Sequence, residues 1–476
     1  MLHLSLLSSK EQELIHNAAI NVLKSVGCEI QDKRWLNVLA DAGVKVDFKK
    51  SRAFITDEDL ITSSIKSCGR FIKTMARDPK NDFILGKDIP KAHTPEGMTH
   101  IIDLMTRKRR RSRLSDLKEM ATLCDASSNV EAIVNPIIPE DSHPAFQSVL
   151  AMKLLLENSS KPVIPGGTAL NKVLPYLFQI QQAVAGERDI MEYSLGLGIF
   201  TTSPLKFSSD QLDILWQCTE IGTPCSIGSA PQAGSTASAH LAGMLTQFAA
   251  EILMGLILGQ VKTPGLRQFI YIRTYLINPR MGSLNASGPE VGLIQAAATQ
   301  LFKEKYQLPV NAGWAVSDSH TVGLQAAYEK AYIWLMTILA GADMISGVGG
   351  LSGGLTASPL QVIIDNEIIG YLKRGFSGIK VDDQHLSVDM IQDLETDGTF
   401  LAHPKTGEIL RKERWFPELS FHDTYEIWKS ANSPEFVEEA ESLAREVLES
   451  HESEPLDPEL RKTLNEVVHK AKKQLL

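Results

Sequence analysis

The sequence predicts an α/β protein: a (β/α)8 TIM barrel with an N-terminal mixed α/β extension and a C-terminal helical segment. Two observations lead to this fold class. From about residue 128 onward, short β-like runs alternate with longer helical runs at intervals of roughly 30 residues, which is typical of a parallel sheet. In addition, the chain has no GxGxxG turn of the kind found in doubly wound dinucleotide-binding sheets. The alternation without that turn favours the closed barrel over an open sheet.

Seven strand–helix units follow from this alternation. The strands are expected at 129–136, 161–167, 194–201, 223–230, 267–274, 308–315 and 342–348. The helices are expected at 144–157, 172–185, 208–220, 238–259, 288–305, 322–340 and 359–374. An eighth strand is expected at 97–104 or at 378–382.

Three segments describe the predicted organisation: an extension at 1–125, the barrel at 126–415 and a charged helical segment at 416–476. In the extension, Ser9 followed by Gln12 predicts a capping box that opens a helix running to about Val26. The C-terminal segment is strongly charged and is interrupted by prolines, so we expect a helical hairpin on the barrel or at a subunit interface.

Composition excludes several classes of function. The chain carries 48 Lys and Arg against 57 Asp and Glu, and this net charge of −9 does not suit a nucleic-acid partner. The one basic run, RKRRRSR at 107–113, lacks interleaved aromatic residues, so a solvated face or internal ion pairs are expected there. The five cysteines are scattered and no basic N-terminal region precedes the first apolar residues, so we expect reduced thiols and a cytoplasmic location. No apolar run reaches 18 residues, so no transmembrane helix is expected.

Chemistry-bearing residues gather where barrel strands end, which is where barrel enzymes place their active sites. Alternation puts Tyr271 and Arg273 on one face of their strand. Trp314, Asp318 and His320 follow a later strand within the run NAGWAVSDSH. Each has a structural alternative: Trp314 as core, Asp318 as a cap of the helix near 322, Arg273 as the partner of a buried carboxylate, and His320 as a surface residue.

No nucleophile–histidine–acid order, HExxH or metal-ligand cluster is visible, so no metal is expected. The glycine-rich run GVGGLSGGLT at 347–356 lacks the Lys-Ser/Thr ending of a P-loop. The chemistry is therefore expected to depend on positioning, with the reactive partner supplied from outside.

An ordered series of segments resembles the trimethylamine methyltransferase superfamily. The segments are TTSPLKF at 201–207, IGSAPQAGSTASAHLAGMLTQFAAEILMGLILGQVKTPG at 227–265, GSLNASGPEVGL at 282–293, SDSHTVGLQAAYEKA at 317–331 and IIDNEIIG at 363–370. This resemblance implies a (β/α)8 barrel. Founding members carry pyrrolysine just before the SDS motif, whereas this chain has ordinary residues there, Trp314 to Asp318. It therefore resembles the branch without pyrrolysine, whose members demethylate glycine betaine, proline betaine, carnitine or γ-butyrobetaine and pass the methyl group to the Co(I) cobamide of a separate corrinoid protein.

The resemblance implies a role for each candidate residue. Trp314 and Tyr271 would form an aromatic wall around a quaternary ammonium group. Asp318 would act in catalysis by supplying negative charge near that group or by orienting neighbouring groups. Arg273 or His320 would bind a substrate carboxylate. Gln247 and Glu251, within the QFAAE run, are further substrate-binding candidates that a helix could equally use structurally.

The expected partners are a small quaternary amine and a cognate corrinoid-binding protein. The resemblance places the cobalamin on the separate corrinoid protein, so cobalamin is expected on the partner and not tightly on this chain. A homo-oligomer is expected from the apolar barrel helices and the charged C-terminal segment. Two other functions stay open: a non-catalytic betaine-binding barrel, and a barrel lyase that would need a strand-end lysine or a metal cluster.

Overall fold

Parallel strands at the centre of the molecule carry the fold. The computed structural model describes residues 2–87, 89–166, 171–394 and 398–476. Six parallel strands form one sheet, in the spatial order β12 (Gly198–Phe200), β14 (Cys225–Ser229), β16 (Gln268–Ile272), β19 (Val310–Ala312), β20 (Met344–Ser346) and β6 (Lys91–His93). Two more parallel strands, β9 (Ile133–Val134) and β10 (Val163–Ile164), pair with each other, and a bridge from His93 to Ala132 links them to β6. The described residues give no pairing of β10 with β12.

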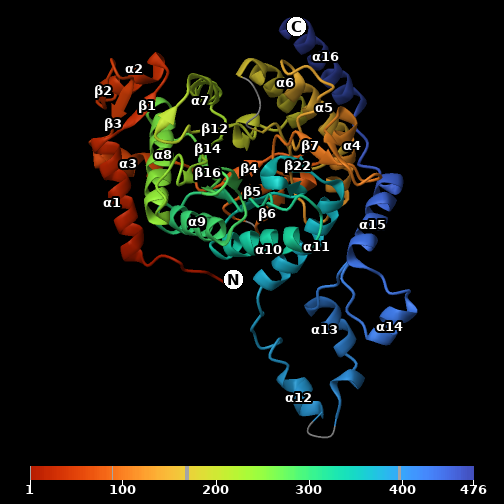
Figure 1. The fold of residues 1–476 in the computed structure, drawn as a ribbon. Helices are drawn as coiled ribbons and strands as arrows, with labels where there is room; N and C mark the ends of the chain where they lie inside the picture. The colour runs from red at the N-terminus through yellow and green to blue at the C-terminus, as the bar shows by residue number, and fades with distance from the viewer. Residues whose placement is uncertain (1, 88, 167–170, 395–397) are drawn as a thin grey trace.

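A helix follows each of these eight strands, and Figure 1 shows the helices surrounding the strands. In chain order they are α4 (Leu114–Ala126), α5 (Gln147–Asn158), α6 (Leu174–Ala185), α7 (Ser209–Ile221), α8 (Leu241–Lys262), α9 (Pro289–Gln300) continued by η4 (Leu301–Lys305), α10 (Leu324–Leu339) and α11 (Pro359–Phe376). All seven expected strand–helix units are confirmed within a few residues, although Gly167 of the second expected strand lies outside the described residues. The α/β class with parallel strands is therefore confirmed.

The strand that continues the sheet beyond β20 is β6, and both positions expected for an eighth strand are wrong. Residues 97–104 contain β7 (His100–Ile102), which belongs to a separate four-stranded sheet with β8 (Arg109–Arg111), β21 (Gly350–Leu351) and β22 (Thr356–Ala357). Residues 378–382 form no strand. β6 has the sequence Lys-Ala-His and follows a polar, turn-rich stretch, so it lacks the run of apolar or β-branched residues that marked the other strands.

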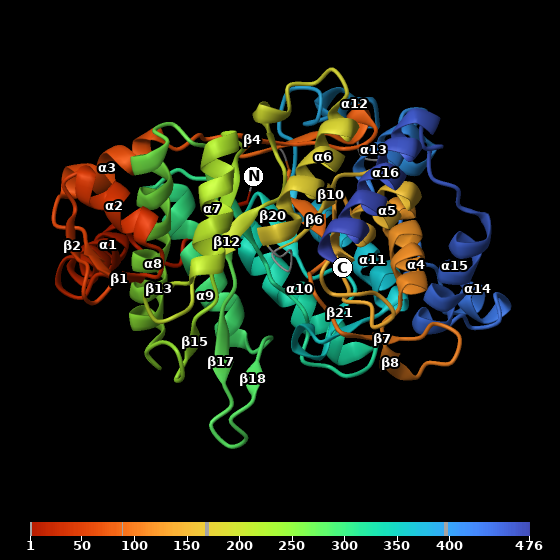
Figure 2. The same ribbon diagram turned by 90° about the horizontal axis from the view of Figure 1, so that it is seen from above.

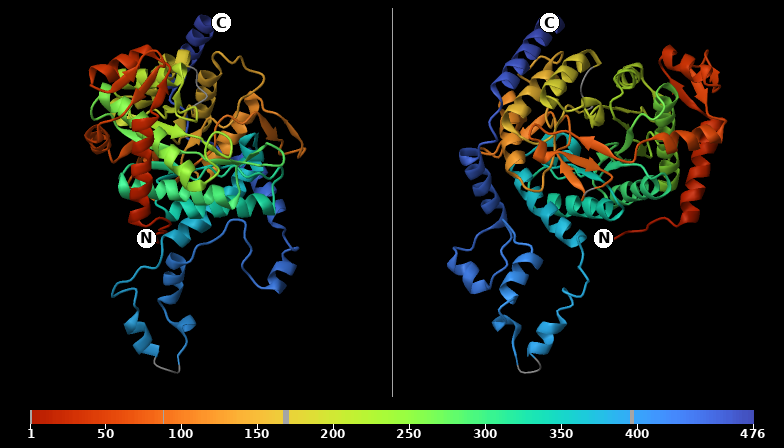
Figure 3. Two further views of the ribbon diagram at one scale, coloured as in Figure 1. Left: turned by 60° about the vertical axis from the view of Figure 1, so that its left-hand side comes forward. Right: turned by 180° about the vertical axis from the view of Figure 1, so that it is seen from behind.

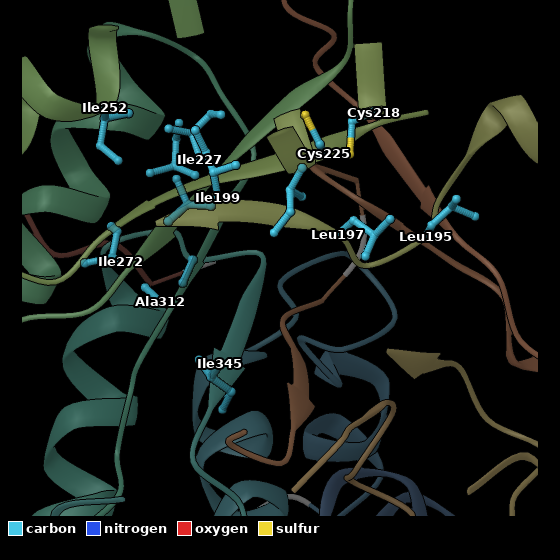
Figure 4. Close-up of a cluster of buried hydrophobic side chains, with 14 of the residues drawn as sticks. Leu195, Leu197, Ile199, Cys218, Cys225, Ile227, Ile252, Ile272, Ala312 and Ile345 are labelled. Atoms are coloured by element: carbon cyan, nitrogen blue, oxygen red, sulfur yellow. The ribbon is translucent and has the colours of Figure 1, made fainter. Parts of the chain in front are cut away.

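Side chains that point outward from the strands pack against the helices. Figure 4 shows Ile199, Ile227, Ile272 and Ile345, each from a different strand, in one buried apolar cluster. Because neighbouring residues of a strand point to opposite faces, the residues between them point away from the helices. The residues that face inward line the cavity described below.

The N-terminal residues form a small layer over α8. It contains α1 (Ser9–Ser25), β1 (Cys28–Ile30), α2 (Lys33–Asp41), β2 (Lys45–Asp47), β3 (Arg52–Phe54) and α3 (Glu58–Ser67), with β13 (Lys206–Phe207) pairing to β1. The capping box of α1 is Ser8 with Glu11, so the expected box at Ser9 and Gln12 is wrong by one residue. Among the described residues α8 alone is long and apolar enough to cross a membrane, but 72% of its apolar window is buried. Packing against α1 and α3 on its outer side explains why this helix is apolar all round.

Two β-structures and the C-terminal helices complete the fold. β4 (Ile72–Thr74) and β5 (Phe83–Leu85) pair with β11 (Tyr193–Ser194), and β17 (Tyr275–Ile277) and β18 (Leu284–Asn285) form the hairpin that projects in Figure 2. β15 (Gln232–Ala233) pairs with β17. α15 (Phe436–Ser450) packs on α4 and α11, and α16 (Pro458–Leu475) packs on α5 and α6. The helices α12 (Val388–Leu394), α13 (Thr406–Glu413) and α14 (Tyr425–Ser430) instead project away from the body (Figure 3).

The basic run at 107–113 makes ion pairs within the chain. Arg110 bridges Asp103 at 2.9 Å and the fully buried Asp116 at 2.8 Å, and Arg107 pairs with Glu441 of α15. These contacts confirm the expected structural use of this run.

Candidate active site

A cavity lies between residues of the parallel strands. Seven of the eight strands contribute side chains to its wall, which include Val134, Ile164, Gly198, Phe200, Ser226, Phe269, Tyr271, Asn311 and Met344. On β16, Phe269 and Tyr271 face the cavity while Ile272 faces the helices. The local β alternation therefore decides which residues of each strand a ligand can reach.

Apolar residues close the end of the cavity at which the strands begin. Thr74 of β4 and Leu85 of β5 line it, and Leu85 packs in a cluster with Phe269 and Met344, early residues of their strands. β4 pairs with β11, which directly precedes β12, so this β-structure covers the strand N-termini. The charged residue of the cavity wall, Glu96, follows the C-terminal end of β6 and lies toward the opposite end.

At that opposite end, an arginine side chain lies among three aromatic rings. Arg273 directly follows β16, and its guanidinium carbon is 3.9 Å from the ring centroid of Trp314, 4.5 Å from that of Phe200 and 4.6 Å from that of Tyr271. Arg273 forms an ion pair with Glu96, and it donates to the Tyr271 hydroxyl at 3.2 Å. We call these five residues the aromatic box. Its rings present the negative faces that attract a cation.

Burial and charge fix the protonation states in the aromatic box. Burial acts to lower the pKa of Arg273, but the carboxylate of Glu96 outweighs it and the pKa is raised, so the guanidinium stays charged. Burial raises the pKa of Tyr271, and that of the neighbouring Tyr275 to about 12, so both hydroxyls are neutral. The side chains of Arg273 and Glu96 are 13% and 7% exposed. One nearly buried cation thus balances one nearly buried anion.

Two buried donors in the aromatic box make no hydrogen bond within the described residues: Arg273 Nε and Trp314 Nε1. Buried donors without partners are uncommon in folded proteins, and they are frequent at binding sites. Both donors are therefore available to acceptor atoms of a ligand.

A neutral histidine borders the same region. His93, at the end of β6, is fully buried, and burial lowers its pKa. Its Nδ1 lies 2.7 Å from the Thr94 carbonyl and its Nε2 lies 3.1 Å from Oδ1 of Asn311, which lines the cavity. The Asn311 side chain is thus within hydrogen-bond distance of the ring.

The structure brings together three of the residues predicted from the sequence: Tyr271, Arg273 and Trp314. Arg273 also has the buried carboxylate partner that was considered as its structural alternative. Asp318 and His320 lie apart from the cavity wall. The Asp318 carboxylate accepts from the backbone N–H groups of Ala286 at 3.0 Å and Ser287 at 3.0 Å, and burial raises its pKa. His320 is exposed, with Nδ1 at 3.0 Å from the Ser352 hydroxyl.

The suggestion that Asp318 caps the following helix is wrong. α10 begins at Leu324, its N-cap is Gly323, and no side chain caps it. Asp318 instead holds the loop at 286–287, and Ala286 packs against Trp314. Asp318 therefore holds in place the loop against which Trp314 of the aromatic box packs.

Gln247 and Glu251 lie on α8 outside the cavity wall. The fully buried Glu251 carboxylate accepts from Thr201 at 2.9 Å, Ser203 at 2.8 Å, Ser229 and the Leu205 N–H at 2.9 Å. Gln247 Nε2 donates to Glu251 at 2.9 Å and to the Thr236 carbonyl at 2.9 Å. These contacts fasten α8 to the loops after β12 and β14, and they leave the carboxylate little capacity for a substrate.

A buried ion pair, which the sequence reading overlooked, fastens two further loops. Lys330 of α10 and Asp365 of α11 are both fully buried and 3.1 Å apart. Lys330 also donates to the carbonyls of Ala315, Gly347 and Gly350 at 2.6–3.0 Å. It therefore joins the loop that carries Trp314, after β19, to the loop after β20. Lys330 lies in the segment 317–331 and Asp365 in the segment 363–370, both of which resemble the family. That resemblance was the sequence signal that could have drawn attention to them.

The sequence reading also overlooked Glu96 and Phe200. Phe200 lies within an expected strand, where an apolar residue is equally consistent with packing against a helix. Glu96 follows β6, the strand that was not located.

The fold and the cavity define the class of this protein: an α/β protein whose parallel strands line a cavity. The chain belongs to the trimethylamine methyltransferase family, whose model matches residues 1–475, and it is a methyltransferase.

Curated relatives match nearly the whole chain. The trimethylamine methyltransferase of Desulfitobacterium hafniense is 29% identical over 97% of this chain and 92% of its own length. The glycine betaine methyltransferase of the same species is 27% identical over 96% of this chain and 95% of its own. Among solved structures, the monomethylamine methyltransferase of Methanosarcina barkeri superposes with a TM-score of 0.52 at 13% identity, over 98% of this chain and 86% of that one. At that identity the likeness concerns the fold alone.

Proposed function

We propose that this methyltransferase demethylates a quaternary amine of the betaine type and passes the methyl group to the Co(I) cobamide of a cognate corrinoid protein. The observation that carries the proposal is the aromatic box, in which three rings and one carboxylate surround a cation. A glycine betaine methyltransferase among the relatives supports the choice of substrate class. We further propose that the eight strands form a (β/α)8 barrel with its seam between β10 and β12.

The reaction needs positioning more than acid–base chemistry. The acceptor supplies the electron pair of the new bond to the methyl carbon. The C–N bond breaks, and its electron pair stays on nitrogen. The leaving group is a neutral tertiary amine, so no general acid has to protonate it. The chain's task is to hold the ammonium group with one methyl in line and to exclude water.

Each residue of the aromatic box has a role in this proposal. Phe200, Tyr271 and Trp314 offer π faces to a trimethylammonium group, which has no N–H to donate. The Arg273 guanidinium occupies the position between the rings that this group would need. Substrate binding therefore exchanges one cation for the other beside Glu96, and the displaced guanidinium pairs with the substrate carboxylate. Asp318 is a positioning residue, acting through Ala286 on Trp314.

The test is an anaerobic assay with the cognate corrinoid protein and with free cob(I)alamin. Glycine betaine, proline betaine, carnitine, γ-butyrobetaine, tetramethylammonium and trimethylamine are compared, and methylcobamide formation is followed by absorbance. Turnover of one betaine, but not of its demethylated product, supports the proposal. If the folded protein forms no methylcobamide with any of these amines, the proposal is overturned in favour of a binding protein.

Three variants test the aromatic box in the same assay. Trp314→Ala should lower kcat/KM about 5- to 30-fold, because a desolvated cation–π contact contributes about 1–2 kcal/mol, whereas Trp314→Phe should retain most activity. Arg273→Met should weaken betaine turnover but not that of tetramethylammonium, which has no carboxylate. A Trp314→Ala enzyme with full kcat/KM would refute the aromatic recognition, and equal losses for both substrates in Arg273→Met would refute the exchange.

A further inference from the structure

Between α11 and α15, the described residues of 379–435, namely 379–394 and 398–435, extend from the body as an arm (Figures 1 and 3). It contains α12, α13 and α14, which are seven, eight and six residues long. Isolated helices of this length are unstable in water unless tertiary packing supports them. The three helices of the arm are therefore stable only if other residues or another molecule pack against them.

The arm has almost no core of its own. Among its described residues, Met390 is the one buried side chain. The arm holds 13 of the 30 large apolar side chains that are exposed in the described chain, although it is a small part of that chain. Ile379 is 88% exposed, Leu401 85%, Val381 74% and Tyr425 66%. Apolar surface gathered in this way, on a segment without a core, marks an interface.

The root of the arm is fixed firmly to α11. Glu367 accepts from the backbone N–H groups of Glu418 and Ser420, both at 3.0 Å, and Arg374 donates to the Glu413 carbonyl at 2.8 Å. These bonds set the direction in which the arm leaves the body. The apolar side chains beyond them are therefore presented to another molecule and are not folded back on this one.

An apolar cleft lies at the same root. Its lining includes Leu2, Tyr371, Ile379 and Trp415, and Tyr371 meets Trp415 edge to face at 5.6 Å. The chain thus carries both a projecting apolar arm and an apolar cleft beside it. Two copies related by a two-fold axis satisfy both features at once, because the arm of each can cover the root of the other.

Charge on the arm agrees with a two-fold arrangement. The stretch 380–394 carries four aspartates and one lysine, and the stretch 405–414 carries four lysines and arginines and two glutamates. Antiparallel pairing of two arms sets the acidic stretch of each against the basic stretch of the other.

We propose that the arm at 379–435 is a dimerisation arm, whose occupant is the arm and root cleft of a second copy of this chain. A second copy is present wherever the chain is made, so it can cover the arm at all times. A corrinoid partner has to leave after each methyl transfer, and it would expose these side chains in every cycle. The proposal does not depend on which amine is the substrate.

The test is the mass of the full-length protein in solution at micromolar concentration, measured by light scattering and sedimentation. The expected mass is at least twice the chain mass of 52.4 kDa. The double variant Ile379→Asp/Leu401→Asp should weaken association at least about tenfold without lowering Tm of the body, since both positions are exposed within one chain. Met281→Asp, 78% exposed on the β17–β18 hairpin, is the matched control and should keep the mass of the native protein.

Amide hydrogen exchange of 379–435 supplies a second readout. Slow exchange in the native protein and fast exchange in the double variant support the dimerisation arm. A monomeric native protein would overturn it, and so would an unchanged mass in the double variant. Protection of the arm only after the corrinoid protein is added would overturn it in favour of that partner as the occupant.

Discussion

The buried ion pair between Lys330 and Asp365 allows a quantitative prediction about stability. Replacing Lys330 by Met removes the partner of a fully buried carboxylate and the donor of three backbone carbonyls. Leaving one member of a buried pair uncompensated costs about 3–5 kcal/mol. We therefore expect Lys330→Met to reduce the free energy of unfolding by about that amount.

A double-mutant cycle separates the pair from its surroundings. Asp365→Asn keeps an acceptor for the Gly349 N–H, which now donates to Asp365 at 2.7 Å. The double variant Lys330→Met/Asp365→Asn leaves no unpaired charge, so its loss of stability should be smaller than the sum of the two single losses by about 1–3 kcal/mol. Lys412→Met, in an exposed pair, is the control and should change stability by less than about 0.5 kcal/mol.

Urea unfolding followed by tryptophan fluorescence measures these changes. Trp334 is a suitable reporter, since its ring centroid lies 5.0 Å from Lys330 Nζ and its Nε1 donates to the Ser346 carbonyl at 2.9 Å. Lys330→Met should also lower kcat/KM, because Lys330 binds the loop that carries Trp314. If the losses of unfolding free energy in the two single variants add up to the loss in the double variant within about 0.5 kcal/mol, the two charges are not coupled and the prediction is refuted.

Two further predictions concern groups that bind no substrate in the proposed site. Glu251→Gln should lower Tm while leaving KM unchanged, because it weakens the acceptor of several buried donors; a raised KM at unchanged Tm would instead assign Glu251 to the substrate. Burial acts to raise the pKa of Asp125, but hydrogen bonds from His451, Ser160 and Ser159 outweigh it and lower the pKa. The stabilisation by Asp125 is therefore full above its unfolded pKa of about 3.9 and is lost as the pH falls below it, so the Tm deficit of Asp125→Asn should be present at pH 7 and shrink toward pH 3. A deficit that does not change with pH would contradict this linkage.

Local patterns in the sequence were sufficient to locate most of the secondary structure. Apolar periodicity placed seven strands and the helices after them, because each strand buries one face against the helices and each helix buries one stripe. β6 was missed because its residues, Lys-Ala-His, form no apolar or β-branched run, and with it the position of Glu96 was missed.

By itself, the sequence determined the α/β class, the family and three members of the aromatic box. Alternation along one strand put Tyr271 and Arg273 on the same face, and the end of another strand presented Trp314. Only the tertiary structure decided that the cation between the rings is Arg273 itself and that Glu96, 177 residues away along the chain, is its partner. The tertiary structure also decided that the Glu251 carboxylate accepts hydrogen bonds from loops distant in the sequence. It likewise showed that the apolar residues of the arm are exposed, which their sequence pattern did not indicate. The physical reason is that periodicity reports which face of a local element is buried, whereas partners in a site are set by how distant strands meet.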